Sequence, residues 1–131
     1  MTAAHYTLLF IAVIMALEAA WAIATPLAMR ERAKSLLEET HAGVGVWRFF
    51  FWGLALLMWL IAWHGNQWAH RALFFIGVFF MTAGFLAQRS GFMESWYNFF
   101  LGRRSATGIR LIYAGELLLA AAFAWMAVQG L

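Results

Sequence analysis

The pattern of apolar and polar positions divides the chain into four long apolar segments and three more polar connections. The apolar segments cover residues 6–28, 47–63, 72–88 and 109–128. Each is close to the ~17 to 25 residues with which a helix crosses a bilayer core of about 30 Å. The pattern predicts an all-α integral membrane protein with one domain, 1–131, whose four transmembrane helices form an antiparallel bundle.

Basic residues predict how this bundle is oriented. They gather in the two long connections, 29–46 and 89–108, as Arg30, Arg32, Lys34, Arg89, Arg103 and Arg104. The short connection between the second and third segments has only Arg71, and neither terminus carries a Lys or Arg. By the positive-inside rule we expect both long connections in the cytoplasm and both termini outside. The expected location is a bacterial inner membrane.

Both long connections are expected to contain helix. In 29–46 the first helix continues into the cytoplasm and ends at Gly43 and Gly45. In 89–108, aromatic residues fall near one helical face, which predicts an interfacial amphipathic helix through Phe92, Trp96, Phe99 and Phe100. The alternative for this connection is an irregular loop with aromatic belt residues.

Composition agrees with a membrane protein and narrows its chemistry. Hydrophobic residues make up 65% of the chain and charged residues 11%, against a soluble norm of about 45 to 50% and about 25%. The absence of Cys excludes disulfides, thiol catalysis and Cys-bound metals. Because the basic residues sit at the ends of apolar segments, the net charge of +3 indicates no nucleic acid. Membrane lipids are the expected surroundings.

A single carboxylate, Glu18, interrupts the apolar run VIMALEAAWAIATP of the first segment. On a helix it shares one face with Trp21 and Thr25, at i+3 and i+7. Pro26 has no N–H to donate to the carbonyl of Ala22, so that carbonyl needs another donor, such as the Thr25 hydroxyl. Another side of the helix has a small residue at every fourth position, which predicts a close helix contact through Ala12, Ala16, Ala20 and Ala24.

The fourth segment carries a second acid, Glu116, one turn after Tyr113. With a rise of ~1.5 Å per residue, Glu18 lies roughly 18 Å and Glu116 roughly 21 Å below the outer face. Two neighbouring carboxyls at that depth do not both ionise, because desolvation and mutual repulsion favour a shared proton. Such a pair can exchange its proton for a cation, or act as general acid and base. The alternative is structural hydrogen bonding to Tyr113 or Thr25.

The two middle segments each present one distinctive face. Trp52, Trp59 and Trp63 fall within about 40° of each other on a helical projection, and they form either an aromatic wall for a ligand or a packing surface. The third segment predicts a helix contact through Gly77, Met81, Gly84 and Gln88.

We expect Ser105 or Thr107 to cap the fourth helix.

Three histidines, His5, His64 and His70, are expected at the outer face. Neutral imidazoles bind zinc and copper, and three suffice for an open site, although these three lack the spacing of a metal motif. The alternative is packing of the rings at the interface. No histidine lies deep in a segment, which disfavours haem, and no phosphate loop or HExxH motif occurs. No cofactor is expected.

The layout resembles that of the small multidrug resistance transporters, since it combines a short chain, four spans and a lone Glu halfway along the first. The similarity covers the topology and this one residue. The third segment, ALFFIGVFFMTAGFLAQ, has no Tyr or Trp to line such a site, the connections are longer, and Glu116 is additional.

Three functions are compatible with these features. The first is proton-coupled transport of a cation or a small cationic molecule, for which four short helices require a homo-oligomer; proton and substrate would bind through Glu18, Trp21, Thr25, Tyr113 and Glu116. The second is a non-catalytic subunit or assembly factor of a larger membrane complex, docked through the alanine stripe and the interfacial helix. The third is a lipid- or quinone-handling enzyme whose carboxylates face a groove.

Overall fold

The computed structural model describes residues 2–42, 44–86 and 92–129, and the side chains of these ranges outside 36–47 and 92–93. Within these ranges the chain is all-helical, as the sequence predicts. The elements are α1 (Ala3–Ala24), α2 (Pro26–Ala42), α3 (Val44–Ala62), α4 (Trp68–Leu86), α5 (Phe92–Tyr97), the π-helical turn η1 (Asn98–Gly102) and α6 (Ala106–Val128).

Three helices, α1, α4 and α6, are long and apolar enough to cross a membrane. They coincide with the predicted segments 6–28, 72–88 and 109–128 to within a few residues at each end. The second predicted segment, 47–63, falls on α3. Among the described residues, the apolar stretch of α3 is the shorter Arg48–Ala62. A membrane location thus follows, by length and composition, from three helices.

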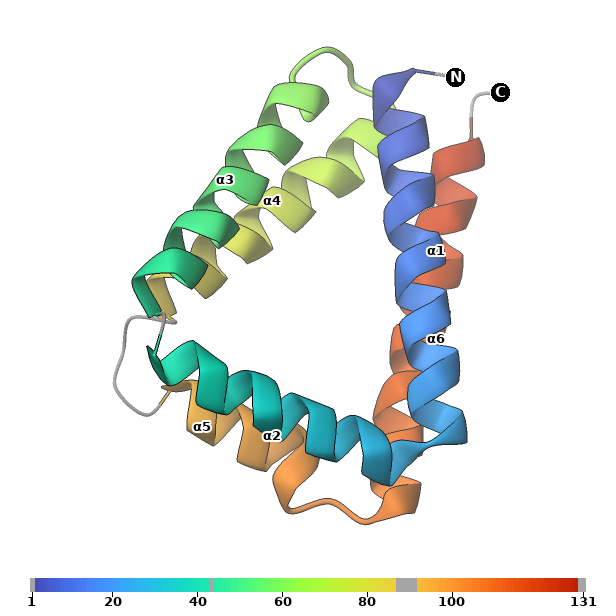
Figure 1. The fold of residues 1–131 in the computed structure, drawn as a ribbon. Helices are drawn as coiled ribbons and strands as arrows, with labels where there is room; N and C mark the ends of the chain where they lie inside the picture. The colour runs from blue at the N-terminus through green and yellow to red at the C-terminus, as the bar shows by residue number, and fades with distance from the viewer. Residues whose placement is uncertain (1, 43, 87–91, 130–131) are drawn as a thin grey trace.

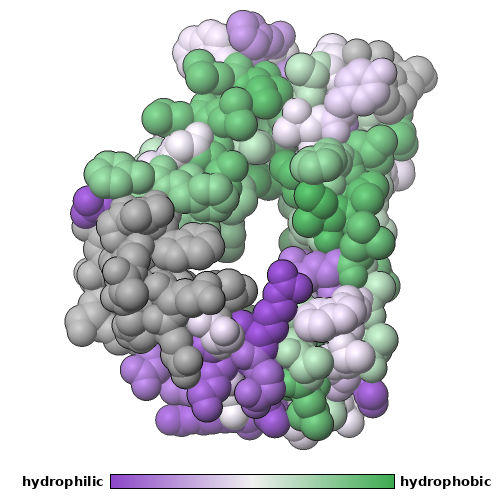
Figure 2. Space-filling model, viewed as in Figure 1, coloured by the Kyte–Doolittle hydropathy of each residue, from purple (hydrophilic) through white to green (hydrophobic). Residues whose placement is uncertain are grey.

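The long helices pack as two antiparallel pairs, α1 with α6 and α3 with α4 (Figure 1). The pairs meet near the two termini and the α3–α4 turn, and they diverge toward the other end, where α2 and α5 lie side by side. Figure 2 shows a hollow between the two pairs, with hydrophilic residues gathered at the α2 end. A cluster of buried residues joins the pairs where they meet: Ala4, Leu8, Met58, Ala62, Ala69, Ala72, Leu73 and Ala127.

The packed face of α1 has steps of three and four residues in alternation. Buried positions follow this spacing and continue into α2: His5, Leu8, Ala12, Ala19, Ala22, Pro26 and Met29. A 3.5-residue repeat stays on one face, whereas a four-residue repeat drifts by about 40° at each step. Within one chain the predicted alanine stripe is therefore packed only in its first half: Ala12 is buried and Ala16 half-buried, but Ala20 and Ala24 are exposed.

The chain bends between α1 and α2 at Thr25, which has φ −133° and ψ 67°. Pro26 lacks the N–H that would continue the α1 ladder, and it disfavours helical geometry in the residue before it. We expected the first helix to continue through the connection 29–46, but it ends at this bend, and residues 26–42 form the separate helix α2. Gly43 lies outside the described residues, and Gly45 falls within α3.

In the second long connection, 89–108, residues 92–102 are helical, in agreement with the predicted helix. They form α5 and then the π-helical turn η1. The Trp96 and Phe100 rings pack with centroids 4.6 Å apart, while Trp96 and Phe99 are exposed. Arg89 and the side chain of Phe92 lie outside the described residues. Aromatic groups are thus available on the outside of this segment, as an interfacial position would require.

Candidate functional site

The pairing of α1 with α6 sets which residues of the two helices face each other. At one end, Arg110 Nε donates a hydrogen bond to the carbonyl of Ile23 at 3.0 Å. At the other end, Ala4 and Ala127 belong to the same buried cluster. Facing positions of an antiparallel pair move in opposite directions along the chain, so these two contacts place Glu18 opposite residues 113–115. Along the α1–α6 pair, Glu18 and Glu116 therefore lie within one helical turn of each other, close to the similar depths predicted from the sequence.

Tyr113 and Glu116 lie on the face of α6 that packs toward α1. This face repeats with the same alternation of four and three residues as α1, through Ile109, Tyr113, Glu116, Ala120, Phe123 and Ala127, all buried or half-buried. Glu18 precedes the buried Ala19, and its own side chain is exposed at the edge of the contact. It is close enough to interact electrostatically with both Tyr113 and Glu116. The structure thus brings these three candidate residues together.

Trp21 and Thr25 share the exposed face of α1 with Glu18, as predicted, but both already have partners. The Thr25 hydroxyl donates to the Trp21 carbonyl at 2.8 Å. The sequence offered this hydroxyl, or water, as a donor to the Ala22 carbonyl; the hydroxyl instead bonds the carbonyl four positions back, which is within reach of its side chain. The guanidinium of Arg32 lies over the Trp21 ring, 5.7 Å from its centroid. The chain itself therefore supplies a cation to this aromatic face.

Sequence reasoning missed that arginines join the helices at the end where α2 and η1 lie. Besides Arg110, Arg30 Nη1 donates to the carbonyl of Arg104 at 3.1 Å. The Nε atom of Arg104 in turn donates to the carbonyl of Phe99 at 3.0 Å. The signal was visible as arginines at the segment ends, but the sequence alone does not show that they bind main-chain carbonyls of distant segments.

Of the three tryptophans considered as a ligand wall, Trp52 and Trp59 pack against glycines of α4, and Trp59 also lines a pocket together with Trp63. Trp59 Nε1 donates to the carbonyl of Phe74 at 3.1 Å, and the indole lies against Gly77. Trp52 lies against Gly84 in the same way, seven residues away on both helices. The predicted contact face of α4 is confirmed at these two glycines, both buried. Gln88 lies outside the described residues, and Met81 is half-buried.

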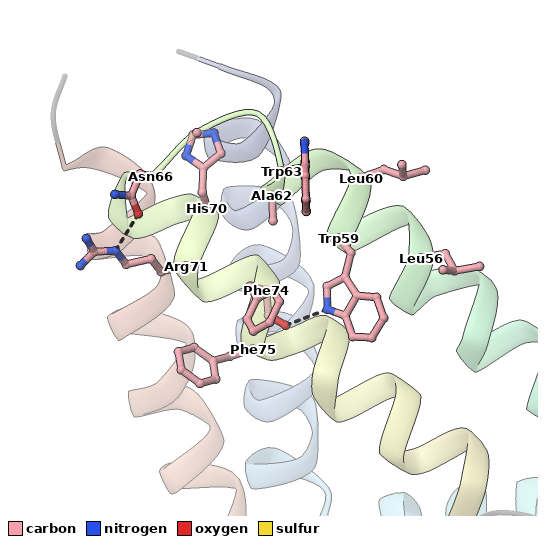
Figure 3. A pocket seen from close by; sticks show the side chains of 11 residues that line it. Leu56, Trp59, Leu60, Ala62, Trp63, Asn66, His70, Arg71, Phe74 and Phe75 are labelled. Carbon is pink, nitrogen blue, oxygen red and sulfur yellow. Dashed lines mark hydrogen bonds between the residues drawn. The ribbon is translucent and has the colours of Figure 1, made fainter.

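Trp63, the third of these tryptophans, is 86% exposed and borders a pocket of about 570 Å³ between α3 and α4 (Figure 3). Its walls are mostly apolar, and its polar members are Asn66, His70 and Arg71. Arg71 Nε lies 3.4 Å from Asn66 Oδ1. None of the lining residues carries a carboxylate, so this pocket does not match the groove of the predicted lipid-handling enzyme.

Two of the three predicted histidines lie in contact where the helix pairs meet. His5 and His70 are 2% and 5% exposed, and their ring centroids are 6.0 Å apart with an interplanar angle of 88°. His64 is exposed on the α3–α4 turn. In the described part of the chain, no three metal-ligating side chains are arranged to hold a metal ion. The predicted site of three histidines therefore reduces to a pair.

Comparison of the chain with protein-family models, with curated proteins and with solved structures gave no match. The class that the structure defines is a protein that is all-helical over its described residues and has three helices able to cross a membrane. Two polar features lie in this apolar framework: the Glu18–Tyr113–Glu116 group between α1 and α6, and the His5–His70 pair near the termini.

Proposed function

We propose that the chain is a homo-oligomeric membrane protein that exchanges protons for a cation, or a small cationic molecule, through Glu18 and Glu116. The observation that carries the proposal is that the α1–α6 pairing places Glu18 opposite the Tyr113–Glu116 face of α6, within range of electrostatic interaction. Two carboxyl groups on two packed helices in an otherwise apolar region form a site that can share one proton.

In this proposal α3 is the fourth span, and the four helices cross the inner membrane of a bacterium in alternating directions. The termini and the α3–α4 turn lie at one end of the molecule, and α2 and α5 at the other (Figure 1). Most of the cationic side chains, among them Arg30, Arg103 and Arg104, belong to that second end. The positive-inside rule then puts it in the cytoplasm and both termini outside.

Oligomerisation follows from the exposure of Glu18. Within a single chain its carboxyl lies at the surface of α1, with apolar residues on either side in the sequence. An ionised carboxylate facing hydrocarbon costs at least about 2.5 kcal/mol. A second copy that covers this face of α1 would shield Glu18 from lipid and enclose the water-accessible path that transport needs.

The exchange needs no covalent chemistry. When the site is empty of substrate, Glu18 and Glu116 hold one proton between them, and the Tyr113 hydroxyl provides a hydrogen-bond partner. A cation that enters the site is attracted to the carboxylates and favours the loss of that proton. Trp21 offers a further aromatic face, which Arg32 occupies when no substrate cation competes for it.

Proton release from the purified protein in weakly buffered detergent, followed with a pH indicator, tests this function. The probes are Na⁺, K⁺, Mg²⁺ and tetraphenylphosphonium, added separately at constant ionic strength. We expect at least one of them to release protons from the wild type and not from Glu18→Gln or Glu116→Gln. Glu31→Gln and Glu94→Gln are matched controls, because they remove exposed carboxylates from α2 and α5, and they should release protons normally.

Two outcomes would refute the proposal. One is proton release that survives unchanged in Glu18→Gln. The other is the absence of release with every probe in a protein that purifies only together with other membrane chains, a result that favours the accessory-subunit hypothesis.

A further inference from the structure

The histidine pair where the two helix pairs meet is a polar feature that proton exchange does not use. His5 comes from the first turn of α1 and His70 from the first turn of α4. Both are more than nine-tenths buried, although each ring has two nitrogen atoms. His5 Nε2 and His70 Nδ1 are buried without a hydrogen-bond partner. Because buried polar atoms are nearly always partnered, two such nitrogens in neighbouring rings indicate a ligand.

The other nitrogen of His5 is already fixed by the chain. His5 Nδ1 lies 2.7 Å from Thr2 Oγ1, a distance that suits a hydrogen bond from Nδ1–H to the hydroxyl oxygen. The backbone N–H of Thr2 also donates a long hydrogen bond of 3.4 Å to this atom, and a tautomer with the proton on Nδ1 gives up that bond for the shorter one to the hydroxyl. With its proton on Nδ1, His5 presents a lone pair on Nε2. A histidine that binds a metal characteristically has such a partner on its other nitrogen.

The second ring is held in place by close packing. An added Cβ on Gly65 would lie 2.5 Å from the Nε2 and Cε1 atoms of His70, so the ring lies directly against this backbone. The centroid distance of 6.0 Å between His5 and His70 also has a chemical meaning. Two imidazoles bound on opposite sides of one ion, with bonds of about 2 Å, place their ring centroids about 6 Å apart. The near-perpendicular ring planes are compatible with that linear arrangement.

From these contacts we infer that His5 and His70 form a two-coordinate binding site for Cu(I). Cu(I) accepts two nitrogen ligands in a linear arrangement, whereas structural zinc sites need four ligands. The elements around the site supply no compensating negative charge, since residues 2–17, 48–86 and 117–129 contain no Asp or Glu. A monovalent cation between two neutral imidazoles therefore fits better than a divalent one. This site is separate from the proposed carboxylate pair and does not depend on it.

An entry path for the ion is present. A pocket of about 450 Å³ reaches His70 from the surface and is bordered by residues from α1, the end of α3 and the α3–α4 turn. Its polar lining residues are Thr2, His64, Gln67 and His70. His64 is exposed and lies near enough to His70 to interact with it electrostatically. It can guide an ion toward the pair without being one of the two ligands.

The test is anaerobic titration of the purified full-length protein with Cu(I), in competition with the chromogenic chelator bicinchoninate. We expect one Cu(I) per chain, abolished by His5→Gln and by His70→Gln and retained in His64→Gln, the matched control on the same turn. X-ray absorption of the loaded wild type should show two nitrogen neighbours and no sulfur. Thr2→Val leaves both ligands in place and removes only the hydroxyl that orients His5, so it should weaken Cu(I) binding by about 10 to 100-fold.

Several results would overturn the inference. They are the absence of Cu(I) binding by the wild type, binding that is unchanged in His5→Gln, sulfur in the metal coordination shell, and loss of binding in His64→Gln as complete as in His70→Gln. Thr2 is exposed, so Thr2→Val reports on the site even if a substitution of the buried histidines prevents folding.

Discussion

The Trp59–Gly77 contact predicts a large difference between glycines that look alike in the sequence. Gly77 of α4 is buried beneath the Trp59 indole, and a Cβ at this position would lie 2.5 Å from Nε1 and 2.6 Å from Cδ1. The indole cannot easily withdraw, because its N–H is bonded to the carbonyl of Phe74 at 3.1 Å. Gly77→Ala must therefore separate α3 from α4 or break that hydrogen bond.

The expected magnitude combines two opposing effects. Overpacking a close contact costs about 1 to 3 kcal/mol, and replacing glycine by alanine within a helix recovers about 0.5 to 1 kcal/mol. The net loss for Gly77→Ala is therefore on the order of 1 kcal/mol. Gly53 and Gly115 are the matched controls, because a Cβ at either position meets no atom within 4 Å. There the alanine should be neutral or should stabilise the protein.

Thermal unfolding of the purified variants in one detergent measures the difference. We expect the midpoint of Gly77→Ala to fall below that of the wild type, and the midpoints of Gly53→Ala and Gly115→Ala to stay at or above it. A Gly77→Ala protein as stable as Gly53→Ala would refute the close packing of Trp59 on α4. The same packing would then also be in doubt for Trp52 on Gly84.

Two further substitutions test the packing of α1 on α6 and the N-terminal cap of α6. Ala19→Leu should destabilise the protein by about 1 to 3 kcal/mol, because Ala19 is fully buried in α1. Ala20→Leu, one residue away on the exposed side, should change stability by less than about 0.5 kcal/mol, and equal effects in denaturation experiments would contradict the 3.5-residue packing face. Ser105→Ala should cost about 1 kcal/mol, because Ser105 Oγ accepts a hydrogen bond from the Gly108 N–H at 3.2 Å. Thr107→Ala is its control. An equally large loss of stability in Thr107→Ala would show that Ser105 is not the residue that caps α6.

Features that depend on local chemistry were predictable from the sequence. The α6 cap is at Ser105, one of two candidates, because a hydroxyl before an apolar helix can satisfy a free N–H of the first turn. The common level of Glu18 and Glu116 followed from counting residues inward from the ends of two apolar segments, since a helix rises by a constant amount per residue. Gly77 and Gly84 were assigned to a helix contact because small residues allow close approach.

Features that depend on the choice of partner were not predictable. Counting every fourth alanine assumes a contact that follows a straight helix, whereas α1 packs on α6 with a 3.5-residue repeat that leaves Ala20 and Ala24 exposed. The role of Trp59 depends on a glycine of the neighbouring helix. The Arg110 hydrogen bond joins positions 87 residues apart through a main-chain carbonyl, which has no residue-specific signature. Such contacts appear only when the helices are placed in space.

The two helix pairs differ in how far apart in the chain their members lie. α3 and α4 are joined by a short turn, so they can associate as soon as residue 86 has been synthesised. α1, by contrast, packs on α6, which begins at residue 106. Nearly the whole chain must be made before the part of α1 around Glu18 can pack on α6. The entropy cost of closing the long segment between the two helices must be overcome as well. The carboxyl pair thus cannot form before α6 has been made, and a chain interrupted before α6 would expose the packed face of α1 to lipid or to quality-control proteases.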